Sequence, residues 1–527
     1  MHIPAFLTVI LINLLFNLDN LECAKILSVF PFTGPSQYLC VQPYLHMLAA
    51  RGHQITSVSA FPQKTPIKNF RDVVLKSDAA NHDEIVLQTI EKMSKNKLSE
   101  LHEVLEYSLL GATLALKSAE FQQLLRTHEH FDLIIIEVLN QDALYPLGQH
   151  FKAPIIGIST FGTNIVIDQL ADNISPIAYL PTPSSKYLDS MTFWQRLHNL
   201  YDSTMELIYQ HLVIIPAHQQ LYETYFPNAT LTLSEIRRNF SLVLLNQHYS
   251  LSWPRPYMPN VIEVAGMHIE HKPKKLPTDM EAFINGSPNG AIYFSLGSNV
   301  KSALLPRARL DVIMAVFASL PVNVLWKYEN PKLPGKPQNV FISKWFPQTD
   351  ILAHPKVKLF ITHGGMHSYI EAVHYGKPIV VMPVFFDQHS NAARAKGKGL
   401  GLVVDFSKLT KQELHSAILE LLNNPMYTAK AQEISAVYHD RPMSALDTAI
   451  FWTEYILKYK GAPHLRVTAR QLNFFQRNSV DTMIVLFGIP LLIMIFIIVG
   501  IYKLLISLLF SRTKGSVIVG KNKCKKE

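Results

Sequence analysis

Apolar residues in the first half of this chain follow two alternating patterns, one with the period of strands and one with the period of helices. Segments of strand length and pattern lie at residues 25–30, 54–60, 131–136 and 153–159. Between the first two segments, apolar residues from Val41 to Ala49 recur at helical spacing. Gly52 can adopt the left-handed backbone conformation that commonly ends a helix. The last two segments have the continuous apolar character of strands buried on both faces. The pattern therefore predicts a doubly wound α/β sheet.

The same alternation begins again after a polar segment rich in Pro and Lys at residues 271–277, which predicts a domain boundary. Strand-like segments follow at residues 290–298, 322–327, 340–342, 357–362 and 378–382, with helices between them. Two α/β domains that face each other form a cleft near the carboxyl ends of their strands, where such sheets bind ligands. We therefore expect a ligand site between the two halves.

The stretch 181–226 departs from the alternation because it is rich in aromatic residues and helix formers, among them Trp194, Tyr201 and Tyr209. It predicts helices that cover a cleft. Their apolar side chains fit plain helix packing equally well as a surface that binds a hydrophobic substrate or touches a membrane.

Both ends of the chain carry apolar segments. The uncharged run from Ile3 to Asn17, with small residues near Ala24, predicts a secretory signal peptide at residues 1–24, and a buried N-terminal helix is the alternative. Residues 482–502 carry no charge and, as a helix, are long enough to cross a hydrocarbon layer of about 30 Å. Residues 503–527 hold seven basic residues and one acidic residue, so the positive-inside rule places this tail in the cytosol. The chain is predicted to be a type I membrane protein.

The final residues, 523–527, resemble a dilysine retrieval signal and predict residence in the endoplasmic reticulum, with a plain basic patch as the alternative. The net charge of +9 comes largely from the tail, and the rest shows no basic stripe or motif for nucleic acid. Cys23 would leave with the signal and Cys524 would be cytosolic, so Cys40 has no partner for an intrachain disulfide. Four glycosylation sequons begin at Asn173, Asn228, Asn239 and Asn285.

The segment between residues 345 and 388 carries the most informative chemistry. The strand predicted to end at Thr362 is followed by His363 and by the pair Gly364-Gly365, and a helix is expected to begin near Ser368. Glycines let a backbone approach a ligand closely, and the exposed N–H groups of a helix N-terminus form an anion site suited to phosphate. The segment therefore predicts a diphosphate site.

Four further side chains in this segment fit the other parts of a nucleotide sugar. Trp345 offers a flat face for a base, and Glu371 offers a carboxylate for ribose hydroxyl groups. Asp387 and Gln388 supply an acceptor and an amide for sugar hydroxyl groups. Each residue alone is a weak signal, but together, in this order and spacing, they are a strong one.

These residues closely resemble the signature of the UDP-glycosyltransferase family, and the likeness extends over nearly the whole chain. Segments 30–32, 51–53, 290–298 and 464–467 also match, and the invertebrate microsomal members are the most similar. The resemblance implies a GT-B fold, in which two Rossmann-like domains face a cleft, followed here by one transmembrane helix. It also implies inverting, metal-free transfer of a hexosyl group from a UDP-sugar to a small lipophilic acceptor, in detoxification or metabolite conjugation. No cofactor is expected. UDP-glucose and UDP-glucuronate remain alternatives as donor, with glucose favoured.

The resemblance implies a role for each matching position in the second half. Trp345 would stack on uracil and Gln348 would contact the uridine. The residues expected to hold the diphosphate are Ser298, His363 and Ser368, beside Gly365.

The remaining donor positions are assigned to the sugars. Glu371 would bind the ribose, and Asp387 and Gln388 would bind the transferred sugar. His367 stands where many relatives carry Asn, which leaves its role open between structural and ligand-binding.

The catalytic base is the main departure from the family pattern. Inverting transfer needs a base that takes the acceptor's proton, and the family uses a histidine oriented by an acidic residue. Here Gln37 occupies the position of the histidine, and Glu137 occupies the position of the acid. Three interpretations follow: Gln37 positions acceptors that are already acidic; Glu137 is the base if burial raises its pKa; or the chain binds UDP-sugars or lipophilic ligands without efficient turnover. His46 lies over two helical turns from Gln37 and is no obvious substitute.

The predicted organisation has seven parts. They are a signal peptide (1–24), an acceptor-binding Rossmann-like domain (25–270), a linker (271–283), a UDP-sugar-binding Rossmann-like domain (284–460), a juxtamembrane segment (461–481), a transmembrane helix (482–502) and a cytosolic tail (503–527). The expected partners are a UDP-sugar, a small lipophilic acceptor and a membrane, with self-association left open. A receptor with an α/β ectodomain is the alternative from another class, but the short tail leaves little room for a signalling module.

Overall fold

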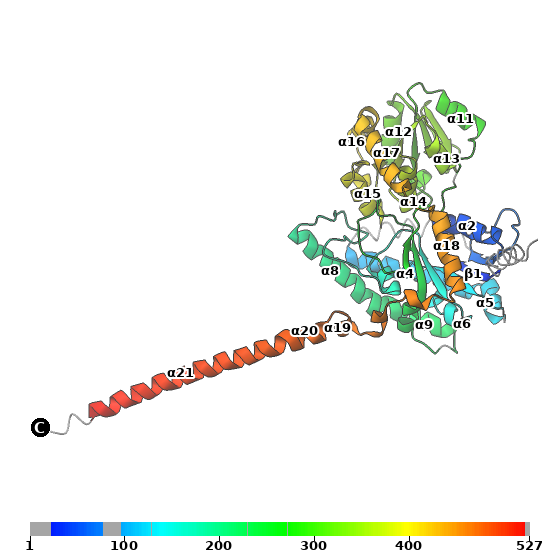
Figure 1. The fold of residues 1–527 in the computed structure, drawn as a ribbon. Coiled ribbons are helices and arrows are strands. Elements are labelled where there is room, and N and C mark those ends of the chain that lie inside the picture. The colour runs from blue at the N-terminus through cyan, green and yellow to red at the C-terminus, as the bar shows by residue number, and fades with distance from the viewer. Residues whose placement is uncertain (1–22, 77–95, 128, 229, 271, 522–527) are drawn as a thin grey trace, which may run out of the picture. The chain divides into compact units, whose positions relative to one another are not determined.

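The computed structural model describes residues 23–76, 96–127, 129–228, 230–270 and 272–521. Most of the predicted signal peptide and the dilysine-like end of the tail lie outside these ranges. The chain forms two compact units, residues 1–466 and 467–527, which are described separately. Figure 1 shows the elements of both units.

A seven-stranded, wholly parallel sheet organises the first half, with the order β3-β2-β1-β4-β5-β6-β7. Its strands are β1 (Lys25–Phe30), β2 (Gln54–Ser59), β3 (Phe70–Val74), β4 (Leu133–Glu137), β5 (Ile155–Ser159), β6 (Phe240–Leu245) and β7 (Val261–Glu263). The main helices around it are α2 (Pro35–Ala50), α4 (Lys97–Lys117), α5 (Ala119–Arg126), α8 (Phe193–Tyr209) and α9 (Ile215–Tyr225), with the short helices α6 (Leu147–His150), α7 (Ile165–Asp168) and α10 (Leu233–Ile236). Strand order reverses between β1 and β4, which is where doubly wound sheets bind ligands.

A second parallel sheet, of six strands in the order β10-β9-β8-β11-β12-β13, organises the other half. Its strands are β8 (Ala291–Ser295), β9 (Asn323–Lys327), β10 (Val340–Ser343), β11 (Val357–Thr362), β12 (Ile379–Val381) and β13 (Gly401–Val403). Its helices are α11 (Thr278–Asn285), α12 (Arg307–Ala318), α13 (Gln348–Ala353), α14 (Met366–His374), α15 (Gln388–Gly397), α16 (Lys411–Asn423) and α17 (Pro425–His439). The switch point here lies between β8 and β11.

Helix α18 (Ala445–Lys458) returns from the second half and packs in the core of the first sheet. Its buried residues Ala449, Ile450 and Ile456 belong to the same apolar cluster as β1 and α2. The hydroxyl groups of Tyr44 and Thr453 lie 2.6 Å apart, and the Arg51 guanidinium pairs with Glu454. In Figure 1, α18 (orange) lies beside α2 (blue). The segment predicted as the second domain, 284–460, therefore contains a helix that packs on the first half.

The aromatic stretch at 181–226 forms α8 and α9, joined by a π-helical turn at Gln210–Ile214. Apolar side chains along α8 are exposed, including Trp194 at 73%. Other parts of the same helices are buried, among them Asn199 and Tyr222. The helices predicted for this stretch are therefore present, and their apolar residues divide between packing and exposure.

The second unit is helical. It contains α19 (Phe474–Arg477), α20 (Val480–Met483), a π-helical turn (Ile484–Gly488) and the long α21 (Ile489–Lys521). Residues 480–511 form a helical stretch that is long enough and apolar enough to cross a membrane, and the mean hydropathy of an 18-residue window within it is 3.1. The transmembrane segment predicted at 482–502 lies within this stretch.

Candidate active site

A cleft with a volume of about 720 Å³ lies where the carboxyl ends of both sheets meet. Residues that follow β1, β5, β8, β11 and β12 line it, so both topological switch points contribute. Ten of the eleven residues predicted for catalysis and donor binding line this one cleft: Gln37, Ser298, Trp345, Gln348, His363, Gly365, Ser368, Glu371, Asp387 and Gln388. The eleventh, Glu137, is buried at the end of β4.

Two glycines enclose the imidazole ring of His363. A Cβ atom on Gly297 would lie 2.5 Å from Cε1 of this ring, and a Cβ atom on Gly365 would lie 2.6 Å from Nε2. Gly297 also has a φ of 80°, which disfavours other residues. Burial and the nearby Lys327 ammonium lower the pKa of His363 to about 4, so the ring is neutral near pH 7. A neutral ring can donate one N–H to a ligand in the cleft.

Helix α14 begins at Met366, directly after Gly365 and two residues before the start predicted near Ser368. Gly365 is its N-cap residue and provides no side-chain cap. The helix N-terminus therefore faces the cleft with backbone N–H groups that suit an anion. Ser368 lies in the first turn and adds a hydroxyl group on the same side.

Trp345 is 56% exposed and lies over the cleft wall. The Nζ atom of Lys327, at the end of β9, lies 5.8 Å from the centre of the indole ring. Lys327 pairs with Glu329 at 2.7 Å, which holds the ammonium group in place. The exposed indole face is therefore available for stacking, beside a fixed positive charge that the sequence did not single out.

The carboxylate of Glu371 is held from two directions. Nε2 of Gln348 donates to Oε2 at 2.8 Å, and Nε2 of His268 lies 3.1 Å from Oε1. The Gln348 amide also donates to Ser368 Oγ at 3.1 Å. His268 follows β7 of the first half, so this network joins the two halves at the donor end of the cleft. The sequence gave no signal for His268 beyond its place three residues before the predicted linker.

His367 also lines the cleft, next to His268. Burial, with smaller contributions from His268 and His363, lowers the pKa of His367 to about 3. Its Nε2 atom has no hydrogen-bond partner in the described part of the chain. The role of His367 therefore stays open between structural and ligand-binding.

Asp387 and Gln388 stand at the start of α15, several residues beyond the end of β12. Nδ2 of Asn391 donates to Asp387 Oδ2 at 2.8 Å, and burial raises the pKa of Asp387 to about 6. Oε1 of Gln388 accepts the backbone N–H groups of Val384 and Phe385. Because Oε1 is engaged in these bonds, the amide nitrogen Nε2 is the group of Gln388 that can bind a ligand in the cleft.

Gln37 lies in the first turn of α2. Its Oε1 atom accepts a hydrogen bond from Ser36 Oγ at 2.8 Å, which leaves Nε2 as a donor. His46 lies further along the same helix, and its Nε2 atom is 2.8 Å from Gln63 Oε1. His46 is absent from the residues that line the cleft among those described.

Glu137 lies beneath the cleft and has no solvent exposure. Burial raises the pKa of Glu137 to about 8. The hydroxyl group of Thr160, which lines the cleft, lies 3.5 Å from Oε1, and Oε2 has no hydrogen-bond partner within the described ranges. Glu137 therefore reaches the cleft only through Thr160, a residue that the sequence did not single out.

One other buried histidine approaches the cleft. Nε2 of His218, on α9, lies 3.0 Å from the hydroxyl group of Ser108, which lines the cleft. Nδ1 of His218 accepts the backbone N–H of Ala143, so the ring proton is on Nε2. Burial also lowers the pKa of His218 to about 4. This histidine therefore donates to Ser108 and has no free lone pair for a substrate proton.

The four sequons differ in exposure. Asn228, Asn239 and Asn285 are exposed. Asn173 is 6% exposed, its Nδ2 donates to Asp168, and its Oδ1 accepts from the Met258 backbone. The fold thus encloses the Asn173 amide. Across the described residues, no group of three or more His, Cys, Asp or Glu side chains is placed to hold a metal ion.

Comparison with known proteins relates the chain to one family. The sequence model described as "UDP-glucoronosyl and UDP-glucosyl transferase" matches residues 24–515. The chain is 35% identical to the UDP-glycosyltransferase UGT5 of Dactylopius coccus over 90% of this chain and 91% of that one. It is 31% identical to human UDP-glucuronosyltransferase 2B10, over 90% and 92% of the two chains.

Solved structures show the same architecture at lower identity. The calicheamicin glycosyltransferase CalG4 superposes with a TM-score of 0.54 at 16% identity, covering 83% of this chain and 99% of that one. At this identity the likeness shows the fold alone, which is GT-B. The fold class expected from the sequence is therefore confirmed. With the family match across the chain, it follows that this protein belongs to the UDP-glucuronosyl and UDP-glucosyl transferase family and is a UDP-glycosyltransferase.

Proposed function

We propose that the protein transfers a hexosyl group, with inversion, from a UDP-sugar to a small lipophilic acceptor, for detoxification or metabolite conjugation. The observation that carries the proposal is a single cleft that holds ten predicted site residues beside an apolar end. We further propose that the catalytic part lies in the lumen of the endoplasmic reticulum, anchored by the apolar helix at residues 480–511.

In this proposal the donor lies across the second half. Trp345 stacks on uracil beside Lys327, and the Glu371 network receives the ribose hydroxyl groups. The neutral His363 ring and the N-terminus of α14 donate to the diphosphate, which carries the negative charge of the leaving group. Asp387 accepts from a sugar hydroxyl, and the Gln388 amide nitrogen donates to another.

The acceptor lies against the first half, where the cleft wall is apolar. Leu39, Tyr107, Leu139 and Phe161 line this end. Small-molecule sites of this type combine an apolar lining with a few placed polar groups. Nε2 of Gln37 supplies one such group, because it can donate to an acceptor oxygen. This arrangement favours acceptors whose hydroxyl group is acidic, such as phenols, which arrive partly as anions.

For less acidic acceptors we propose a route for the proton through Thr160. The acceptor oxygen attacks the anomeric carbon, the bond to UDP breaks, and the acceptor proton passes to Thr160 Oγ1. The Thr160 proton passes in turn to Glu137 Oε1, so the threonine is unchanged at the end. A carboxylate with a pKa of about 8 is a stronger base than an ordinary one, but only a minor fraction is ionised at pH 7.

A second candidate function follows from Gln37, since an amide cannot act as a base. In this alternative the chain binds UDP-sugars or lipophilic ligands with little turnover. Release of UDP by microsomes that carry the full chain separates the two, measured with several UDP-sugars and a series of phenols. Acceptor-dependent release supports the transferase, whereas UDP binding without release, unchanged by Gln37→His, supports the binding protein. Absence of measurable UDP affinity contradicts the transferase and the binding of UDP-sugars.

A further inference from the structure

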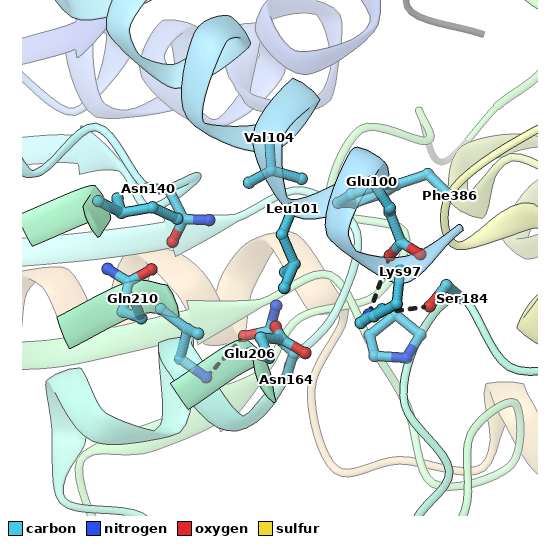
Figure 2. Close-up of a pocket in the computed structure, with 13 residues that line it drawn as sticks. Lys97, Glu100, Leu101, Val104, Asn140, Asn164, Ser184, Glu206, Gln210 and Phe386 are labelled. Carbon is cyan, nitrogen blue, oxygen red and sulfur yellow. Dashed lines mark hydrogen bonds and ion pairs between the residues drawn. The ribbon is translucent and has the colours of Figure 1, made fainter. Parts of the chain in front are cut away.

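A small side pocket extends the acceptor end of the cleft. Val104 and Phe386 line both cavities, so the two spaces lie on either side of these side chains. Figure 2 shows the side pocket with polar groups from several elements around it. Apart from Phe386, its lining residues belong to the acceptor half, on α4 and in the segments that follow β4 and β5.

Consecutive parts of the same elements line the two cavities. On α4, Val104 and Tyr107 line the cleft, whereas Lys97 and Glu100, up to two turns earlier, line the side pocket. At a rise of 1.5 Å per residue, the pocket extends the site by roughly 10 Å along this helix. An extended chain on a molecule bound in the cleft is long enough to span this distance.

Carboxylates outnumber cations around the side pocket. Lys97 pairs with Glu100 at 3.1 Å, and its Nζ also donates to Ser184 at 3.4 Å. Glu206, on α8, lines the pocket as a second carboxyl group. Asp202, one turn earlier on the same helix, is 8% exposed and pairs with His198 at 3.3 Å. Among the described residues that line the pocket, Lys97 is thus one cation beside the two carboxyl groups of Glu100 and Glu206.

Burial and the neighbouring charges together set the pKa shifts of these groups. Burial raises the pKa of Glu206, and Lys97 offsets this only in part because Glu100 and Asp202 oppose it. Burial alone would lower the pKa of Lys97, but the carboxylates of Glu206 and Glu100 raise it. A second cation in the pocket would compensate the remaining charge.

An unpartnered buried amide points to the same type of ligand. Gln210 lines the pocket and has no solvent exposure. Its Nε2 donates to Asp142 Oδ2 at 3.2 Å, whereas Oε1 has no hydrogen-bond partner among the residues that the structure describes. A buried acceptor without a partner costs free energy of roughly 1–3 kcal/mol. A ligand N–H group would remove this cost.

We propose that the side pocket binds the ammonium end of an acceptor whose hydroxyl group reacts in the cleft. Glu206 supplies the charge, and Gln210 Oε1 accepts a hydrogen bond. The natural acceptors are then amphiphilic amines, with an apolar ring or chain between the reacting hydroxyl group and the amine. This inference rests on the proposed transfer function, which it makes more specific.

The test uses two matched series of phenols, one with aminoalkyl chains of two to eight carbons and one with hydroxyalkyl chains of the same lengths. The full-length chain in microsomes is assayed with each at saturating UDP-sugar. We expect at least a tenfold higher kcat/KM for the amine at an optimal chain length. In Glu206→Gln the amine preference is lost while the rate with hydroxyalkyl phenols is kept. Glu433→Gln, the same change at an exposed site on α17, keeps the preference.

Two results would overturn the inference while leaving the transferase proposal intact: turnover without amine preference at any chain length, and a preference that persists in Glu206→Gln. If no phenol is turned over, the transferase proposal fails instead. In that case the pocket is tested by measuring how much each series of phenols raises the thermal unfolding temperature of the UDP-saturated chain. Equal stabilisation by amines and alcohols would overturn the inference in that case as well.

Discussion

Nε2 of His268 lies 3.1 Å from Oε1 of Glu371, although 103 residues separate the two in the chain. The first residue belongs to the end of the first half and the second to α14 of the other half. The carboxylate predicted to bind ribose is therefore oriented by a side chain from the opposite half.

Loss of this contact is expected to weaken donor binding. In His268→Ala, the Glu371 carboxylate loses one of its two partners, and we expect the KM for the UDP-sugar to rise about tenfold, equivalent to about 1.4 kcal/mol. His268→Gln, which keeps an N–H donor, should recover part of the loss. Steady-state kinetics check this, with His130→Ala at an exposed position as the control. An unchanged KM would show that His268 does not orient the ribose site.

The enclosure of His363 makes a second prediction. In Gly365→Ala the new Cβ would lie 2.6 Å from Nε2 of His363, so the ring must move. We expect the affinity for UDP to fall at least tenfold with little change in thermal unfolding, since the φ of −60° at Gly365 suits alanine. Gly286→Ala is a matched control because its φ is −69° and it lies far from the cleft residues. Calorimetric titration with UDP distinguishes them, and equal affinities would refute the role of His363.

Restoring a base at position 37 tests the catalytic proposal. Gln37→His places an imidazole where the family carries its histidine, and general base catalysis typically contributes a factor of about 10² to 10⁴. We expect turnover of simple alcohols to rise at least tenfold. Turnover of acidic phenols should rise less, because a phenol loses its proton more readily and depends less on a general base. Gln37→Ala should show no such gain. A rise of equal size for both acceptor classes would contradict the proposal that acidity replaces the base.

The buried carboxyl group of Glu137 predicts a dependence on pH. If Glu137 accepts the proton, kcat/KM for weakly acidic alcohols rises with pH and levels off above about 8, because the ionised form is the base. Glu137→Gln should remove this rise without changing UDP affinity. A rate that is unaffected by Glu137→Gln would leave Thr160 without a proton acceptor and exclude this route.

The same group predicts how stability changes with pH. The folded-state pKa of about 8 lies above the ordinary value of 4.5, so the folded chain holds this proton where the unfolded chain has lost it. Its contribution to the free energy of unfolding is therefore fully present below about pH 4.5 and falls by about 1.4 kcal/mol per pH unit up to about pH 8. Glu137→Gln should flatten this part of the stability profile relative to Glu433→Gln, as measured by chemical unfolding in microsome-derived detergent extracts.

Strands with a clear apolar pattern were predictable from the sequence, including the short β10 and β12, whereas several other elements were not. The strands β1 and β11 match their predicted bounds, because each has several apolar residues in sequence, and α2 ends where predicted but begins six residues before Val41. β7 and β13 have only three residues each, too few to establish a period. β6 has six buried residues and carried a readable signal, but it lies after the irregular helical stretch and was not predicted.

The donor side of the site was readable because its residues lie in one segment with fixed spacing. Its partners from other segments, such as His268 and Lys327, were not readable, since only folding brings them beside Glu371 and Trp345. The burial of Glu137 was also outside the reach of the sequence. Its depth depends on Thr160 after β5, a neighbour across the sheet and 23 residues away in the chain.

The return of α18 to the first sheet has a mechanical consequence. The backbone passes between the two halves twice, once through the segment that begins after β7 and once between α17 and α18. The two halves are therefore joined covalently at two points, and the packing of α18 adds a non-covalent attachment. A protease cut in the exposed segment 272–275 would therefore leave two fragments that stay associated, held by the Tyr44–Thr453 and Arg51–Glu454 contacts and the apolar face of α18.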